Sequence, residues 1–388
     1  MGIYTEYLDR QMSFQDLAAE RKAQLQRISA LRGGRDILVF AADLSKGQAP
    51  ISIGYNDLLP INDQLANLNG SALDLILETP GGSGEAAEDI VRSLRNRYND
   101  LAIIVPGWAK SAGTIMVMAA DEILMEPSSA LGPIDAQILW QGKVFSADAL
   151  LEGFEKIKKE VEDTGALNRA YIPILQGISP GELQSAENAL KFAKVLVTDW
   201  LARYKFQGWS QHSSTSAPVT TDEKRKRAEE IAGQLCDHRR WLTHGRSIKL
   251  ADLDSMRLRI TDYSRQTELA DAIRRYYTLL QMTFATNIYK VFETPTSQVY
   301  RFIMQQVPPP QPPPASAEAE VAIIEAKCGK CNTTTRVQAN IGQARPLQAG
   351  CVAFPASNKL TCQNCGAEMD LADARRQIEG QAKKPVVA

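Results

Sequence analysis

Two glycine-bearing turns of the chain carry the residue types that acyl-transfer chemistry requires. The first spans residues 79–84 (TPGGSG) and the second spans residues 106–114 (PGWAKSAGT). Each leads from an expected strand into an expected helix, whose start presents unpaired backbone N–H groups and a partial positive charge. Glycine lets the backbone itself approach a substrate, because no Cβ stands in the way. Ser111 lies at the start of the second helix, where a nucleophile would be needed.

The two turns, if they face one another, could form an oxyanion hole. One N–H would come from the glycine turn and another from the residue after the serine. Donors aimed at charge that develops in the transition state are often the largest single catalytic contribution. The plain alternative is that the glycines only close strand–helix connections. The presence of both turns in consecutive strand–helix units, with a serine in the second, favours a serine hydrolase.

Four of the six cysteines form two C-x-x-C pairs near the C-terminus. They are Cys328, Cys331, Cys362 and Cys365. Two such pairs supply four thiolates for tetrahedral Zn²⁺, and the absence of an open position makes the zinc structural. Residues 332–361 exceed the usual spacing of about 15–20 residues, so a longer hairpin or insertion is expected between the pairs. Cys351 lies in this insertion and is expected to be a bystander. We predict a small zinc ribbon.

The composition disfavours several functional classes. Lys plus Arg (44) nearly balances Asp plus Glu (45), so a net charge of −1 gives no bulk attraction to nucleic acid or to anionic membranes. The first residues lack the apolar core of a secretory signal. The most apolar stretch, residues 101–119, is interrupted by Pro106, Gly107 and Lys110, short of the about 20 apolar residues of a membrane helix. We therefore expect a cytoplasmic protein that binds neither membranes nor nucleic acid.

The elements that would position these residues alternate between strand and helix. Apolar runs predict buried strands at residues 36–43, 73–79, 101–105 and 122–125. Helices are predicted at residues 55–68, 85–97, 111–119, 147–204 (more than one), 224–235 and 266–288. Strands that alternate with helices at this spacing indicate βαβ units and a parallel sheet, so the predicted fold class is α/β.

Changes in composition divide the chain into five segments. These are an N-terminal helical segment (1–32), a serine hydrolase domain (33–300), a proline-rich linker (301–320), the zinc-ribbon module (321–379) and a disordered tail (380–388). The run VPPPQPPP at residues 307–314 should form a semi-rigid polyproline spacer.

The central motifs resemble those of the Clp-protease, signal-peptide-peptidase and serine-dehydrogenase-proteinase relatives. The motifs are residues 79–84 after LILE, residues 110–125 (KSAGTIMVMAADEILM) and residues 127–137 (PSSALGPIDAQ). The resemblance is greatest to the serine-dehydrogenase proteinases, which carry KSAGT and GPID in this order, and it covers about residues 35–265. It implies a Clp/crotonase-like spiral of βαβ units with helical insertions, built into rings or stacks of identical subunits.

The same resemblance implies roles for individual residues. Ser111 would be the nucleophile, and the N–H groups of Gly82 (or Gly81) and Ala112 would form the oxyanion hole. A protein or peptide would be the substrate. The chain has no Walker motif, so any ATP-driven unfolding would need a separate ATPase as partner.

The sequence departs from the Clp pattern at the residue that would act as general base. About 25 residues after the serine, where Clp proteases carry histidine, this chain has GPID at residues 132–135. The signal-peptide-peptidase branch uses a lysine whose pKa is lowered by loss of solvent. The candidate lysines are Lys156, Lys158, Lys159, Lys191 and Lys194. Residues 189–197, which contain Lys191 and Lys194, are more apolar than the surroundings of the first three. The resemblance implies that the corresponding helix lies near the site, and Lys191 is preferred.

Two histidines are the alternatives to a lysine. His238 and His244 flank Trp241 in a segment that resembles the family's closing segment, and a structural role is favoured for each. Asp135 is expected to be a turn or interface residue, and Lys110 is expected to be exposed. A Ser–Lys pair is thus preferred to a Ser–His pair.

We expect a serine peptidase that acts through a Ser111 acyl-enzyme, and two other functions remain open. A crotonase-like enzyme would use the same oxyanion hole for a thioester enolate, but the serine and the absence of a coenzyme A signature count against it. An inactive scaffold would bind partners through its zinc ribbon, and the missing histidine at the Clp position leaves this open.

Overall fold

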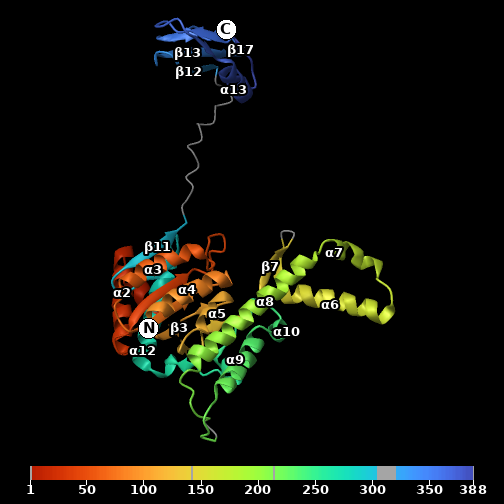
Figure 1. Cartoon of the computed structure of the whole chain (residues 1–388). Coiled ribbons are helices and arrows are strands. Elements are labelled where there is room, and N and C mark those ends of the chain that lie inside the picture. The colour runs from red at the N-terminus through yellow and green to blue at the C-terminus, as the bar shows by residue number, and fades with distance from the viewer. Residues whose placement is uncertain (1, 141–142, 213–214, 304–319, 388) are drawn as a thin grey trace. The chain divides into compact units, whose positions relative to one another are not determined.

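The computed structural model describes residues 2–140, 143–212, 215–303 and 320–387. The chain divides into two compact units, Met1–Met304 and Gln305–Ala388. Most of the predicted proline-rich linker lies outside the described residues. Figure 1 shows the α/β unit, with the N-terminus, and the smaller C-terminal unit.

A seven-stranded sheet forms the centre of the first unit, with strand order β11-β10-β1-β2-β3-β5-β9. Five of its strands run parallel: β1 (Asp36–Ala42), β2 (Ala72–Glu78), β3 (Asp100–Ile104), β5 (Glu122–Met125) and β9 (Thr261–Asp262). The α/β fold class with a parallel sheet is therefore confirmed. The strands β10 (Ile288–Glu293) and β11 (Gln298–Phe302) add an antiparallel edge beside β1 that the sequence did not predict.

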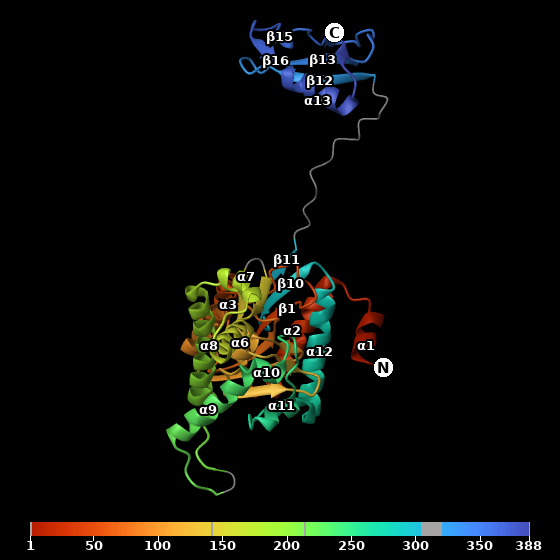
Figure 2. The same cartoon turned by 90° about the vertical axis from the view of Figure 1, so that its right-hand side faces the viewer.

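Helices cover both faces of this sheet, so alternate residues of each strand are buried in different cores. Leu38 and Phe40 of β1 belong to the larger core, while Ile37 and Val39 point into the other. Burial on both faces explains why these strands appear in the sequence as continuous apolar runs. Figure 2 shows α2 (Phe14–Leu31) and α12 (Thr267–Phe284) together on one side. The other face is covered by α3 (Leu58–Ala66), α4 (Gly84–Arg97), α5 (Ala112–Val117), α8 (Pro180–Trp200) and α9 (Thr221–Leu235).

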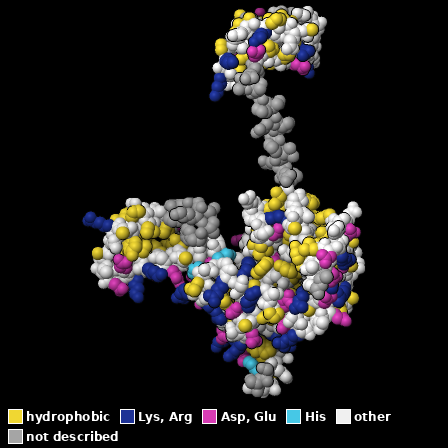
Figure 3. All heavy atoms as spheres, turned by 180° about the vertical axis from the view of Figure 1, so that it is seen from behind, with side chains coloured by type: hydrophobic (Ala, Val, Ile, Leu, Met, Phe, Trp, Pro, Cys, Tyr) yellow, Lys and Arg dark blue, Asp and Glu magenta, His cyan; other side chains and the backbone are white. Residues whose placement is uncertain are grey.

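A helical arm projects from this body and consists of α6 (Ala147–Thr164), α7 (Ile172–Gln176) and the first turns of α8 (Figure 1). The hairpin of β7 (Gln137–Trp140) and β8 (Lys143–Ser146) precedes it. Hydrophobic side chains gather on the arm's surface (Figure 3), and of α6 only Ala147 is buried. After α9 come α10 (His238–Trp241) and α11 (Leu250–Ser255), and the short helix α1 (Ile3–Asp9) precedes α2.

The C-terminal unit combines short strands with one helix. Its elements are β12 (Val321–Lys327), β13 (Thr334–Ile341), β14 (Cys351–Ala353), β15 (Lys359–Thr361), β16 (Glu368–Asp370), α13 (Ala372–Ala382) and β17 (Val386–Val387). The predicted disordered tail at residues 380–388 is wrong for the residues up to 387. Here β17 pairs with the edge of β13 and Val386 is buried, because two valines cover an otherwise open strand edge.

Within the described ranges, none of the helices has the length and apolar character needed to cross a membrane.

Candidate active site

Ser111 occupies a sharp turn between β4 (Trp108–Ala109) and α5. Its backbone has φ +51° and ψ −117°, a conformation that side-chain-bearing residues rarely adopt and that costs on the order of 1–3 kcal/mol. Two hydrogen bonds hold the turn: Gly113 N–H donates to Lys110 O (2.8 Å), and Lys110 N–H donates to Thr79 O (3.0 Å). Strain maintained in this way is typical of turns that present a nucleophile above a sheet.

The glycine turn at the end of β2 lies directly against the serine turn. A Cβ placed on Gly81, which has φ +98°, would lie 2.6 Å from Ser111 Cβ. A Cβ on Gly82 would lie 2.4 Å from the backbone N and O of Ile53, on the other side of the turn. Both positions therefore need glycine, and the two turns that the sequence singled out lie in contact.

Two of the three predicted oxyanion donors have a free N–H. The N–H of Gly81 donates to Thr79 Oγ1 at 3.1 Å, so it is already used. Ala112 is the first residue of α5 and has no helical acceptor for its N–H. Within the described part of the chain, neither Ala112 N–H nor Gly82 N–H has an acceptor. The pair that remains for an oxyanion is Gly82 and Ala112.

A cavity of about 380 Å³ opens beside Ser111. Its walls are the two turns, residues 134–137, one face of α8 and the side chain of His244. Ile115, Ile134 and Phe192 supply apolar surface. The histidine comes from the loop after α10, which is distant from the serine in sequence, so tertiary structure brings the two side chains into one cavity.

Asp135 is a buried carboxylate beside this cavity rather than a simple turn residue. It accepts hydrogen bonds from Ser146 Oγ (2.6 Å) and Gln137 Nε2 (2.9 Å). Two imidazoles approach its Oδ2: His238 Nδ1 at 3.4 Å and His244 Nδ1 at 3.7 Å. Burial alone would raise the pKa of Asp135, but the interactions with these histidines and Ser146 outweigh it and lower the pKa. An ionised carboxylate thus faces His244.

The Nδ1 of His244 lies near the carboxylate of Asp135 without forming a hydrogen bond to it. Its Nδ1 is buried and has no hydrogen-bond partner among the described residues. The separation of 3.7 Å from Asp135 Oδ2 is longer than a hydrogen bond. Catalytic hydrogen bonds are often long in unliganded structures and shorten when substrate binds. The loop itself is pinned to the segment before Asp135, since Leu131 and Ile248 exchange two backbone hydrogen bonds (3.0 and 2.9 Å).

Lys110 connects the three segments that carry Ser111, Asp135 and His244. Its Nζ contacts the carbonyl oxygens of Gly245 and Arg246 and the hydroxyl of Ser247 (3.3, 3.2 and 3.0 Å). Its stem packs on Gly132, where an added Cβ would lie 2.7 Å from Lys110 Cδ. The expectation that Lys110 is exposed is wrong, because burial of the stem and the anchoring of the ammonium hold it half-buried.

The preferred lysine is not part of this cavity. Ala189, Phe192 and Ala193 form the face of α8 that lines it, at helical spacings of three and four residues. Lys191 and Lys194 lie off this face and are exposed. The other three candidates, Lys156, Lys158 and Lys159, are exposed on α6. The structure brings a histidine, rather than any of these lysines, to the cavity that contains Ser111.

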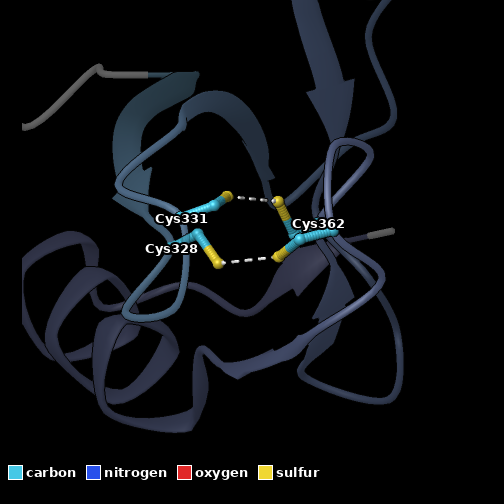
Figure 4. Close-up of side chains that lie close together, drawn as sticks. Cys328, Cys331 and Cys362 are labelled. Atoms are coloured by element: carbon cyan, nitrogen blue, oxygen red, sulfur yellow. Dashed lines mark hydrogen bonds between the residues drawn. The ribbon is translucent and has the colours of Figure 1, made fainter.

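The four cysteines of the two C-x-x-C pairs converge in the C-terminal unit (Figure 4). Cys328 and Cys365 lie 3.6 Å apart, as do Cys331 and Cys362, and all four sulfurs lie within 4.8 Å of one another. A tetrahedron with Zn–S bonds of about 2.3 Å places its sulfurs about 3.8 Å apart. The donor set and its spacing therefore fit a zinc ion, and Cys351 is not part of the cluster.

Comparisons with known proteins agree with this geometry. Residues 7–172 match the family model of the ClpP-like SDH-type serine proteinases. Two uncharacterized proteins of Methanocaldococcus jannaschii are similar over shorter stretches. One is 36% identical over 91 residues (24% of this chain, 30% of the relative), and the other is 42% identical over 66 residues (17% and 23%). The chain thus matches less than a third of the length of either relative.

A solved structure of a mutant membrane-bound stomatin-specific protease, in complex with a substrate peptide, is also similar. It is 23% identical, with a TM-score of 0.22, over 29% of this chain and 57% of that protein. So low a score adds nothing to the argument. The family match, in contrast, contains both glycine-bearing turns, Ser111 and Asp135. Residues 7–172, less than half of the chain, are thus similar to the ClpP-like SDH-type serine proteinases.

Proposed function

We propose that this chain is a serine peptidase in which Ser111 is the nucleophile, His244 the general base and Asp135 the residue that orients His244. The observation that carries the proposal is the common cavity of Ser111 and His244, which buried Asp135 also lines, with its Oδ2 at 3.7 Å from His244 Nδ1. The strained serine turn and the two free N–H groups beside it fit the same role.

The geometry suggests the following sequence of steps. The Oγ of Ser111 attacks the scissile carbonyl while the Nε2 of His244 takes the hydroxyl proton. Asp135 remains ionised and stabilises the imidazolium through Nδ1–H. The N–H groups of Gly82 and Ala112 stabilise the oxyanion of the tetrahedral intermediate. The imidazolium then protonates the leaving amine, and water releases the acyl group by the reverse steps.

A histidine base replaces the lysine that the sequence favoured. A lysine acts as a base only when burial destabilises its ammonium form. The exposed Lys191 has no such burial. Its position on α8, off the face that lines the cavity, also directs it away from the serine. The proposal therefore keeps the serine nucleophile and the backbone oxyanion hole but changes the base.

Covalent labelling tests the proposal directly. The full chain should react with a fluorophosphonate probe, which forms a bond only with an activated serine. Peptide mapping by mass spectrometry should find the label on Ser111. A folded protein that takes up no label, or that carries it on another serine, would overturn the assignment. An inactive scaffold and a crotonase-like enzyme both predict no labelling.

We further propose that the cysteine cluster holds one structural Zn²⁺. The C-terminal unit has only a small hydrophobic core, centred on Val337 and Phe354. Units below about 70–80 residues seldom reach stability from such a core alone and commonly need a metal or disulfides. Four thiolates that surround the ion would leave no position for a substrate.

Removal of zinc should unfold the C-terminal unit while the α/β unit stays folded. Freshly purified protein should contain about one zinc per chain by mass spectrometry of metals. After chelation, or in Cys362→Ser, limited proteolysis should cleave within residues 320–387 and spare residues 1–303. Cys351→Ser is the matched control and should keep its zinc, because Cys351 lies outside the cluster. A C-terminal unit that resists protease without metal would contradict this prediction.

We also propose that the chain forms a homo-oligomer through the helical arm. Leu167, Ile172 and Ile174 are exposed on the arm at 42%, 39% and 48%. Apolar side chains gathered in this way commonly mark a protein interface. Light scattering should give a mass that is a multiple of the 42.7 kDa chain. Ile172→Glu combined with Ile174→Glu should reduce it. A monomer at working concentrations would refute the proposal.

A further inference from the structure

A second cavity, of about 820 Å³, lies in the α/β unit away from Ser111. It is bounded by Asp121 and Glu122 at the start of β5 and by Thr261 at the start of β9. The Ser111 cavity, in contrast, begins just after the carboxyl end of β2. Since these strands run parallel, the two cavities lie at opposite edges of the sheet. The second cavity is therefore separate from the proposed active site.

The two acidic side chains of this cavity are bound by partners outside it. Asp121 accepts from Arg95 Nη1 (2.7 Å) and from the backbone N–H of Leu101 (2.8 Å). Glu122 accepts from Arg32 Nη2 and from Thr261 Oγ1 (2.7 Å each). Neither Arg95 nor Arg32 lines the cavity. Each acid is therefore paired with a cation outside the cavity, although both acids still act against the effect of burial on the pKa of Lys205.

Four cations line the same cavity, namely Lys205, Arg227, Arg257 and Arg259. Arg227 pairs with Glu230 at 2.8 Å. Within the described ranges, the side chains of Arg257 and Arg259 form no hydrogen bond or ion pair. The Nζ of Lys205 donates to the carbonyl oxygen of Asp121 at 3.3 Å. Burial lowers the pKa of Lys205 to about 8, and the charge of Arg259 acts in the same direction.

A bound anion would balance the positive charges of Lys205, Arg257 and Arg259, which face the same cavity. Guanidinium groups bind phosphate with paired hydrogen bonds, which are stronger than those between neutral groups. A phosphate between Arg257, Arg259 and Lys205 would give these three side chains an anionic partner, which none of them has among the described residues. It would also stabilise the ammonium form of the half-buried lysine. The cavity is thus suited to an anionic group such as phosphate.

An aromatic wall stands beside these cations. Trp209 packs edge-to-face on Phe206 (5.8 Å between centroids) and on His212 (5.5 Å). Trp209 lies between the π-helical turn Leu201–Lys205, which follows α8, and α9. Stacking of a nucleobase on an aromatic side chain contributes about 1–3 kcal/mol. A volume of about 820 Å³ lies within the range of about 300–1,000 Å³ found for small-molecule sites.

We propose that this cavity binds a nucleoside phosphate, with the phosphate held by Lys205, Arg257 and Arg259 and the base placed against Trp209. The site would act as a ligand site remote from the proposed peptidase centre. It does not depend on the peptidase proposal, because it rests on other residues at the other edge of the sheet.

Calorimetric titration of the full chain tests the site with AMP, ATP and inorganic phosphate as the ligands. At least one nucleotide should bind more tightly than inorganic phosphate, and higher salt should weaken binding. Arg259→Gln and Arg257→Gln should each weaken nucleotide binding at least tenfold. Arg225→Gln is the matched control: this arginine, on α9, pairs with Asp199 outside the cavity and should leave binding unchanged.

The variant Trp209→Ala tests the binding of the base separately from the binding of the phosphate. It should weaken nucleotide binding severalfold and leave phosphate binding unchanged. Equal affinities for phosphate and nucleotide, with no effect of Trp209→Ala, would overturn the nucleoside assignment. No binding at millimolar ligand would overturn the site as a whole. The exposed Arg259 side chain makes Arg259→Gln safe for folding, and thermal unfolding of each variant checks this.

Discussion

Ser111→Ala is expected to abolish peptide hydrolysis, with a fall in kcat/KM on the order of 10⁴- to 10⁶-fold. The substitution removes the only atom that can form the acyl-enzyme in the proposed mechanism. The oxyanion donors Gly82 and Ala112 and the cavity remain, so substrate binding should persist and KM should change little. The measurement is steady-state hydrolysis of a peptide or casein substrate, with probe labelling in parallel. Hydrolysis at an unchanged rate in pure variant would refute the assignment.

The backbone strain at Ser111 provides a second readout on the same position. Alanine at φ +51° keeps the strain that serine has, so Ser111→Ala should unfold at nearly the wild-type temperature. Ser111→Gly relieves the strain and should be more stable than Ser111→Ala by about 1 kcal/mol, partly offset by the flexibility of glycine in the unfolded chain. Both variants should lack activity. A stable, inactive Ser111→Gly would show that the fold maintains the strain for the sake of the site.

The central strands could be predicted from the sequence because both of their faces are buried. The strand β10 could not be predicted from the sequence because it buries two charged residues. Lys290 is held by Asp57 Oδ2 at 2.7 Å, and Glu293 is held by Arg21 Nη2 at 3.0 Å. Both partners lie more than two hundred residues away in the chain, and without them a charged residue indicates an exposed position.

The location of Lys191 outside the Ser111 cavity could not be predicted from the sequence, for a related reason. Lys191 lies in an apolar stretch of helix, but such a stretch does not reveal which of its residues face a cavity. Only the stripe of Ala189, Phe192 and Ala193 does so. The pairing of Asp135 with His244 depends on contacts between distant segments, such as Ile134 N–H with Leu235 O (2.9 Å). Both residues stood in recognised motifs, yet nothing local linked them.

His244→Ala is expected to reduce kcat by about 10³- to 10⁴-fold while the protein stays folded. The side chain is partly exposed at the cavity, so its removal should cost little stability. Lys191→Ala is the matched test of the base that the sequence favoured and should change activity less than twofold. His238→Ala removes the other imidazole beside Asp135, but His238 does not line the cavity, so a smaller loss is expected.

Asp135→Asn completes this set, because it keeps the shape of the site but removes the charge that orients His244. Since the pKa of Asp135 lies below its ordinary value of about 4, the carboxylate stays ionised at any higher pH. Loss of wild-type activity between neutrality and that value therefore reports on the base rather than on Asp135. Probe labelling of Ser111 should be slow in both His244→Ala and Asp135→Asn, since the serine persists without its activation. Full activity in His244→Ala, together with its loss in Lys191→Ala, would restore the lysine as base.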